Sequence, residues 1–147
     1  MHILLVDNDI DDRELFVEAF KAIEPDFKVT STWYEPNLFK KFEDLKYHLP
    51  DFIFLDLNMD EKSGIECLDE IKTIPWLNDV PVFIYSTSTW DSQIETTYQK
   101  GASLYVQKPS SFEEIKTLLR KILDLPTDYY FPQAEKENFL FKVLKPH

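Results

Sequence analysis

The residue types best suited to chemistry in this sequence follow short apolar runs. Asp7 and Asn8 follow one such run, and Asp56, Ser86 and Lys108 each follow another. A single Asp or Ser in such a place is usually a turn or helix-capping residue, so no one of them indicates a site by itself. Together they supply carboxylates, a hydroxyl and an ammonium, the groups that position and neutralise a phosphate during its transfer. The set therefore indicates phosphoryl transfer with Asp56 as the nucleophile, if the runs end side by side.

The elements that would position these residues alternate between strands and helices. Apolar runs predict strands at 3–6, 27–33, 52–55, 82–85 and 104–106. The spacing of apolar residues predicts helices at 10–24, 38–49, 64–74, 90–100 and through 115–122. This alternation is typical of the α/β class, a doubly wound parallel sheet with helices on both faces. Ligands of such sheets bind at the carboxyl ends of the strands, which is where the candidate residues would lie.

A cation is expected at the same edge of the sheet. Carboxylates at the ends of neighbouring strands would repel each other at neutral pH unless a positive charge compensates them. A site built from oxygen atoms suits Mg²⁺, which takes few protein ligands and keeps several waters. Such a cation would neutralise charge on an incoming phosphate. The Lys108 ammonium would pair with one phosphate oxygen, and the Ser86 hydroxyl would donate to another.

The composition disfavours several other classes of protein. The 147 residues include 27 acidic and 16 basic ones, a formal charge of −11, which opposes binding to the phosphate backbone of nucleic acids. Cys67 is the single cysteine, so neither an intramolecular disulfide nor a cysteine-based zinc site is expected. No apolar run approaches the ~20 residues that cross a membrane, and the sequence shows no signal-peptide pattern. A cytoplasmic location is the expectation.

Residues 126–147 differ from the rest of the chain. Their charges balance, and they carry five aromatic residues: Tyr129, Tyr130, Phe131, Phe139 and Phe141. The segment is too short for a second domain, so we expect one domain at 1–125 and a C-terminal extension at 126–147. We expect the extension to pack on its own domain. A grip on a second subunit or on a partner is the alternative.

Four motifs together resemble the receiver domains of two-component response regulators. They are LLVDND at 4–9, FLDLNM at 54–59 followed by Gly64, PVFIYS at 81–86 and YVQKP at 105–109. The resemblance covers about residues 1–124 and implies a five-stranded, flavodoxin-like sheet of strand order 2-1-3-4-5. It also implies a stand-alone receiver with no attached output domain. Such a protein is a phosphoacceptor that catalyses only its own phosphorylation and dephosphorylation, and is not otherwise an enzyme.

The resemblance gives each candidate residue a role. Asp56 is the phosphoacceptor, and Ser86 and Lys108 bind the phosphate. Ser86 and Tyr105 form the switch, in which the tyrosine turns inward when Ser86 is drawn to the phosphate. The Lys108–Pro109 bond is expected to be cis. The implied Mg²⁺ ligands are Asp7, Asn8, Asp56 and, through its backbone carbonyl, Asn58.

The resemblance also implies partners for this chain. The phosphoryl group would come from a histidine kinase or a phosphotransfer protein. Output would pass to a downstream protein through the face formed by the fourth helix, at 90–100, and the fifth strand around Tyr105. A homodimer is a further option.

Three positions depart from the usual pattern of the family. Asn8 stands where a metal-binding carboxylate is usual, and the lost negative charge should lower the affinity for Mg²⁺. Asp60 replaces a proline, which leaves that loop less rigid. Thr87 is bulkier than the small residue usual beside Ser86. The acceptor, the lysine and the hydroxyl all remain, so we expect the site to be active.

Two other functions remain open. A degenerate receiver would bind partners without phosphorylation, with Asn8 as the first sign of a lost metal site. A haloacid-dehalogenase-like phosphatase would use Asp7 as nucleophile and Asp9 as general acid and base. That family needs a further acidic pair after the lysine on another strand, and it leaves Asp56 without a role. The phosphatase is therefore the weaker alternative.

Overall fold

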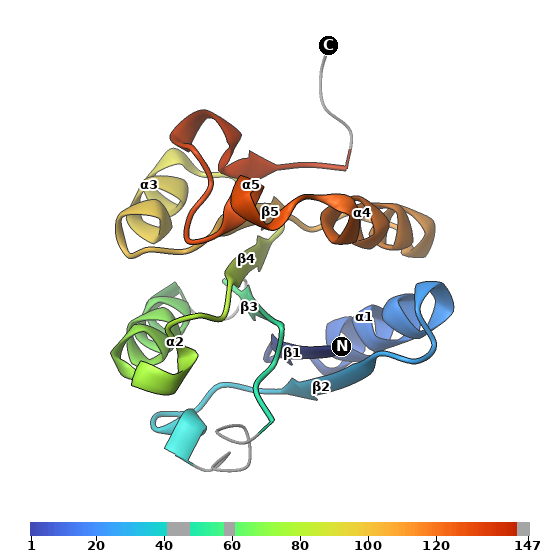
Figure 1. The fold of residues 1–147 in the computed structure, drawn as a ribbon, viewed down its shortest axis with the longest axis horizontal. Helices are drawn as coiled ribbons and strands as arrows, with labels where there is room; N and C mark the ends of the chain where they lie inside the picture. Colours follow the sequence, from blue (N-terminus) through green and yellow to red (C-terminus); the bar gives the residue numbers. More distant parts are fainter. Residues whose placement is uncertain (41–47, 58–60, 144–147) are drawn as a thin grey trace.

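The structure, a computed structural model, describes residues 1–40, 48–57 and 61–143 (Figure 1). Its centre is one parallel sheet in the order β2-β1-β3-β4-β5-β6. The strands are β1 (His2–Val6), β2 (Lys28–Thr32), β3 (Phe52–Asp56), β4 (Val82–Ser86), β5 (Leu104–Gln107) and β6 (Leu140–Phe141). The α/β class and the predicted order 2-1-3-4-5 are confirmed. A sixth strand, which the sequence did not predict, extends the sheet beyond β5.

Helices cover both faces of this sheet. In Figure 1, α1 and α4 lie on one face, and α2 and α3 lie on the other. The α-helices are α1 (Ile10–Ile23), α2 (Glu61–Thr73), α3 (Asp91–Gln99), α4 (Phe112–Asp124) and the short α5 (Thr127–Tyr130). Short 3-10 helices are η1 (Leu38–Lys40), η3 (Pro75–Leu77) and η4 (Lys136–Asn138). In the part of the chain that the structure describes, no helix has the length and apolar character needed to cross a membrane.

The helix predicted at 38–49 is described only in part. It begins with the 3-10 helix η1, and residues 41–47 lie outside the described residues. Leu49, at the predicted end, is described and is not helical. Pro50 follows it directly, and the residue before a proline is pushed toward extended backbone by steric contact with the ring. This restriction accounts for the non-helical backbone of Leu49.

The sheet is buried from both sides. Every residue of β1, β3 and β4 is buried, as expected for parallel strands between two layers of helices. From α1, Phe16 packs edge-on against Phe54 of β3 and Tyr85 of β4, with ring centroids 5.1 and 5.6 Å apart. The predicted apolar stripe of α4 is buried as well: Ile115, Leu118, Leu119 and Ile122. This close packing holds the strand ends, and any group attached to them, in fixed positions.

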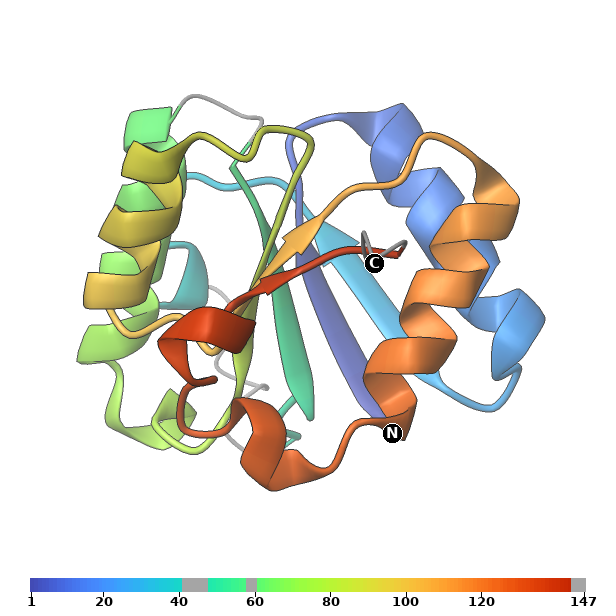
Figure 2. The same cartoon turned by 90° about the horizontal axis from the view of Figure 1, so that it is seen from above.

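The tail, defined as residues 126–143, returns along the domain and joins the sheet. In Figure 2 it runs from the end of α4 past β5, and its strand β6 lies beside β5. Its first part, α5, places Tyr130 against Phe83, with ring centroids 5.0 Å apart. Its last part forms β6, which pairs in parallel with Tyr105 and Val106 of β5. The tail therefore covers the edge of β5.

Candidate functional site

Two buried carboxylates lie at the carboxyl edge of the sheet. Asp7 follows β1 directly, and Asp56 is the last residue of β3. These strands are parallel neighbours with Val6 opposite Leu55, so the two aspartates that come next are level with each other. Asp7 is 0% exposed and Asp56 is 2% exposed. Because carboxylates are almost never fully buried unless they are paired, a compensating charge is required nearby.

Lys108, which follows β5, supplies this charge. Its Nζ lies 3.1 Å from Asp7 Oδ2 and 3.1 Å from Asp56 Oδ1. A third carboxylate approaches from the first turn of α1, with Asp12 Oδ2 3.0 Å from the same nitrogen. The structure thus brings together three of the residues that the sequence selected, and it adds Asp12.

The surrounding carboxylates stabilise the charged form of Lys108. Burial disfavours the ammonium, but the charges of Asp56 and Asp7 and the hydrogen bond to Asp12 outweigh it, so the pKa of Lys108 is raised. The ammonium also lies 5.2 Å from the ring centroid of Tyr85. Burial, followed by the same three carboxylates, raises the pKa of the Tyr85 hydroxyl. That phenol therefore stays neutral and adds no further negative charge to the cluster.

Asp12 is the residue of this cluster that the sequence reasoning missed. It lies in the first turn of α1, where acidic residues are common because they favour the positive end of the helix. Asp9 is the N-cap of α1, and its Oδ1 accepts from the backbone N–H groups of Asp11 and Asp12 at 2.8 and 3.1 Å. The sequence could have indicated Asp12, because α1 begins shortly after β1, and the first turn of a helix in that place lies over the carboxyl edge of the sheet.

One predicted metal residue, Asn8, does not contact the observed cluster, and another, Asn58, cannot be placed. Asn8 is exposed, and its Oδ1 accepts a hydrogen bond from the backbone N–H of Tyr34 at 2.9 Å. Its amide therefore ties the end of β1 to the segment after β2. Asn58 lies outside the described residues.

Gly64 of α2 packs closely against Leu57, the residue after Asp56. A Cβ added at Gly64 would lie 2.5 Å from Leu57 Cδ2, so a residue without a side chain allows α2 to approach this loop.

The acidic cluster has the donor chemistry of a divalent-cation site. Three carboxylates face one ammonium, which leaves a formal charge of −2. Carboxylate oxygens are the ligands that Mg²⁺ and Mn²⁺ prefer, and Mg²⁺ needs only one or two of them because it keeps several waters. Among the described residues, no group of three or more His, Cys, Asp or Glu side chains is arranged to hold a metal ion. Carboxylates at this edge suit a cation such as Mg²⁺ that keeps waters as most of its ligands.

Ser86 and Tyr105 belong to one buried hydrogen-bond network next to the cluster. Ser86 ends β4 directly after Tyr85, the register partner of Asp56, and is 0% exposed. Its Oγ accepts from the backbone N–H of Ser88 at 3.2 Å. Tyr105 lies inward, and its hydroxyl donates to the carbonyl of Ser88 at 2.7 Å. The two predicted switch residues are therefore linked through Ser88.

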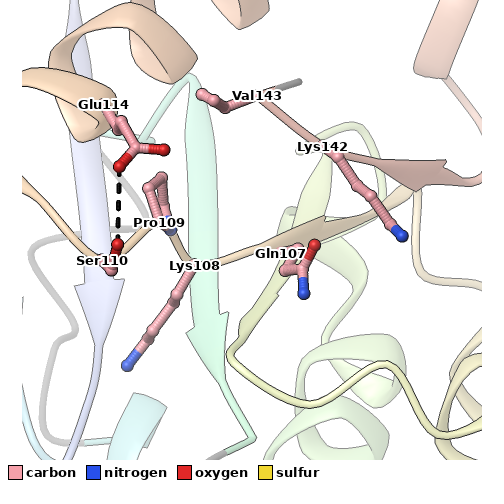
Figure 3. Close-up of a pocket in the computed structure, with 7 residues that line it drawn as sticks. All are labelled: Gln107, Lys108, Pro109, Ser110, Glu114, Lys142 and Val143. Carbon is pink, nitrogen blue, oxygen red and sulfur yellow. Dashed lines mark hydrogen bonds between the residues drawn. The ribbon is translucent and has the colours of Figure 1, made fainter. Parts of the chain in front are cut away.

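The loop after β5 also borders a surface pocket of about 340 Å³ (Figure 3). In Figure 3 the side chain of Lys108 points away from Glu114 and Lys142, in line with its contacts to the acidic cluster. The Lys108–Pro109 bond in this loop is not cis, so that prediction was wrong; the trans form is the lower-energy one for most bonds of this type. Among the described residues, the cis bond is Phe131–Pro132 in the tail.

Comparison with known proteins agrees with this geometry. The model of the response regulator receiver domain family matches residues 3–120. Two-component response regulator ARR5 of Arabidopsis thaliana is 30% identical over 128 residues, which are 80% of this chain and 68% of that protein. Response regulator Rcp1 of Synechocystis sp. is 32% identical over 73 residues, 50% of each protein. The chain spans about half the length of several curated relatives that it matches.

Solved structures show the same architecture. The Mn(2+)-bound form of response regulator Rcp1 is 27% identical with a TM-score of 0.68, covering 86% of this chain and 96% of that one. The phosphorylated cyanobacterial phytochrome response regulator RcpA is 26% identical with a TM-score of 0.66, covering 88% of this chain and 93% of that one.

Proposed function

The chain belongs to the family of response regulator receiver domains, and from this premise we propose that Asp56 accepts a phosphoryl group from a histidine kinase or a phosphotransfer protein. Receiver domains of two-component systems are phosphoacceptors and not enzymes with a separate substrate. The observation that carries the proposal is the contact of Lys108 Nζ with Asp56 Oδ1 at 3.1 Å, inside a cluster of carboxylates. Family membership leaves the phosphatase alternative without support.

The side chains around Asp56 suit each part of the transfer. An oxygen of Asp56 would attack the donor phosphorus and form an acyl phosphate, while the bond from phosphorus to the donor nitrogen breaks and its electron pair stays on nitrogen. Lys108, already beside Asp56, would pair with a phosphoryl oxygen, and the Ser86 hydroxyl would donate to another. Incubation with acetyl phosphate and Mg²⁺, followed by intact-mass measurement, tests the proposal. The expected result is a gain of one phosphoryl group.

We propose Mg²⁺ as the cofactor of this transfer. A bound Mg²⁺ would neutralise charge on the phosphoryl oxygens. Asp7 and Asp56 are the carboxylates best placed to hold it, because both are buried and both face Lys108. The proposed set also includes Asn8 and the backbone carbonyl of Asn58. The relative Rcp1 has been solved in a Mn(2+)-bound form, which supports a divalent cation as the cofactor.

Replacement of Asn8 by Asp is expected to tighten Mg²⁺ binding by roughly tenfold. The change adds a negative charge at the end of β1, next to the buried Asp7, and such a charge attracts a nearby divalent cation. A carboxylate can still accept the hydrogen bond from the N–H of Tyr34 that Asn8 accepts now. Titration calorimetry with MgCl₂ on wild type and Asn8→Asp measures the difference.

The matched control for this titration is Asn78→Asp, which adds the same charge at an exposed position after η3. We expect its affinity for Mg²⁺ to equal that of wild type within about twofold, because Asn78 precedes β4, whereas the site lies at the carboxyl ends of the strands, and salt screens exposed charges. An unchanged affinity in Asn8→Asp, or an equal gain in both variants, would remove Asn8 from the metal site.

Output is proposed to pass to a downstream protein through the face of α3 and β5. The tail covers part of this face. Its strand β6 pairs with the outer edge of β5, and Lys136 Nζ of the tail lies 3.2 Å from Glu95 Oε2 of α3. A partner of this face would therefore contact α3 together with the tail. A homodimer through the same face is the second arrangement that this proposal allows.

A further inference from the structure

Tyr105 connects the tail to the candidate site. It is 0% exposed, and it makes two sets of contacts with other segments of the chain. One set comes from the tail, which pairs with β5 as strand β6. The other set comes from the loop between β4 and α3, which carries Ser88. Contacts of the tail with Tyr105 can therefore affect the loop after β4, whose Ser88 is hydrogen-bonded to Ser86.

On the tail side, Phe139 makes the contacts to Tyr105. Its carbonyl accepts the backbone N–H of Tyr105 at 2.8 Å. Its ring is buried, with its centroid 6.3 Å from the ring of Tyr105 and 5.0 Å from that of Tyr98 on α3. Gln133 anchors the same segment, because its Nε2 donates to the carbonyls of Tyr98 and Ala102 at 2.6 and 2.9 Å. Phe139 thus contacts both the backbone and the ring of Tyr105 from the tail side.

On the site side, the hydroxyl of Tyr105 fixes the position of Ser88. It donates to the carbonyl of Ser88 at 2.7 Å and lies 3.3 Å from Gln93 Oε1. Ser88 Oγ also donates to Gln93 Oε1, and the backbone N–H of Ser88 donates to Ser86 Oγ at 3.2 Å. An outward turn of Tyr105 would break the first of these bonds and loosen the segment that orients the Ser86 hydroxyl.

We propose that Phe139 is a positioning residue for phosphoryl transfer: its packing holds Tyr105 inward, and Tyr105 in turn holds Ser88 and the Ser86 hydroxyl in place. The inference rests on the proposed function, because it concerns how readily that same site is phosphorylated. Coupling between two sites is reciprocal. A phosphoryl group on Asp56 therefore tightens the docking of the tail, and the tail belongs to the switch as well as to the core.

Tyr130 provides the matched control for Phe139. Both are buried aromatic residues of the tail, at 4% and 1% exposure. Tyr130 packs on Phe83 and Phe52, with ring centroids 5.0 and 5.9 Å away, near the amino ends of β4 and β3 and so at the opposite edge from Asp56. If the tail only stabilises the fold, removal of either ring has the same consequence for phosphorylation.

The test compares Phe139→Ala and Tyr130→Ala by rate of phosphorylation with acetyl phosphate and Mg²⁺, at a temperature where circular dichroism shows both folded. We expect Phe139→Ala to slow the reaction roughly three- to tenfold and Tyr130→Ala by less than about twofold. Phe139→Leu, which refills most of the space and is less destabilising, should recover most of the rate. In a Tyr105→Phe background, Phe139→Ala should have little further effect, because both changes break the same path.

Hydrogen exchange gives a readout that needs no phosphoryl group. The amide of Ser88, which donates to Ser86 Oγ, should lose protection in Phe139→Ala and keep it in Tyr130→Ala. If wild type takes up no phosphoryl group, the proposed function fails, and the exchange result alone decides the inference. Equal rates and equal exchange in the two alanine variants, or additive effects of Phe139→Ala and Tyr105→Phe, would overturn it.

Discussion

Replacement of Asp56 by Asn is expected to abolish phosphorylation by acetyl phosphate and Mg²⁺, whereas wild type gains one phosphoryl group. The amide is nearly isosteric with the carboxylate but is a far weaker nucleophile, and loss of the attacking group costs on the order of 10³-fold or more in rate. The substitution leaves Asp7 and Asp12 to pair with Lys108, so the fold is expected to persist. Intact mass after a time course measures the number of phosphoryl groups.

Asp69→Asn is the control for the Asp56 variant. Asp69 pairs with Lys100 at 3.0 Å on the surface of α2, and its side chain is 52% exposed. The same change of chemistry there should leave phosphorylation as in wild type. A phosphoryl group on Asp56→Asn would assign the acceptor to another residue. No gain in wild type would instead favour the degenerate receiver, a module that binds partners without phosphorylation.

The sequence predicted the site residues that depend on strand ends. Asp7, Asp56 and Lys108 follow apolar runs, and in a parallel sheet all such runs end at one edge, so the pattern sufficed to bring them together. Contacts that depend on side-chain direction within a polar segment could not be found this way. The amide of Asn8 turns to the N–H of Tyr34, and Asp12 reaches Lys108 from a helix turn that looks solvent-exposed in sequence.

The sixth strand shows a second limit of sequence patterns. Strand β6 has only two residues, Leu140 and Phe141, and is too short to show an alternating pattern or a buried apolar run in the sequence. Their pairing with β5 depends on Phe139 and on anchors far away in the sequence, such as the hydrogen bonds of Gln133 to Tyr98 and Ala102. The formation of β6 therefore depends on tertiary contacts, whereas the apolar composition of the central strands is enough to predict them from the sequence.

Replacement of Lys108 by Met is expected to lower the free energy of unfolding by about 3 kcal/mol at neutral pH without added divalent metal. The ammonium lies within 3.1 Å of Asp7 and Asp56, which are almost completely buried, and removal of one partner from a buried ion pair costs about 3–5 kcal/mol. Met keeps most of the apolar volume of the lysine stem, so the decrease in unfolding free energy measures the effect of removing the ammonium charge. Urea unfolding of both proteins, followed by circular dichroism, measures it.

The loss of unfolding free energy in Lys108→Met should be smaller in two conditions, because acid removes the uncompensated negative charge and Mg²⁺ neutralises it. As pH falls from neutral toward 5, buried carboxylates without the ammonium take up protons more readily in the folded than in the unfolded state, so stability relative to wild type rises. Added Mg²⁺ binds the folded form and should also restore stability. Lys100→Met, which removes an exposed partner of Asp69, should cost less than about 1 kcal/mol. If both lysine variants lose equally little, or if neither acid nor Mg²⁺ helps Lys108→Met, the carboxylates at the sheet edge do not form a charge-compensated cluster.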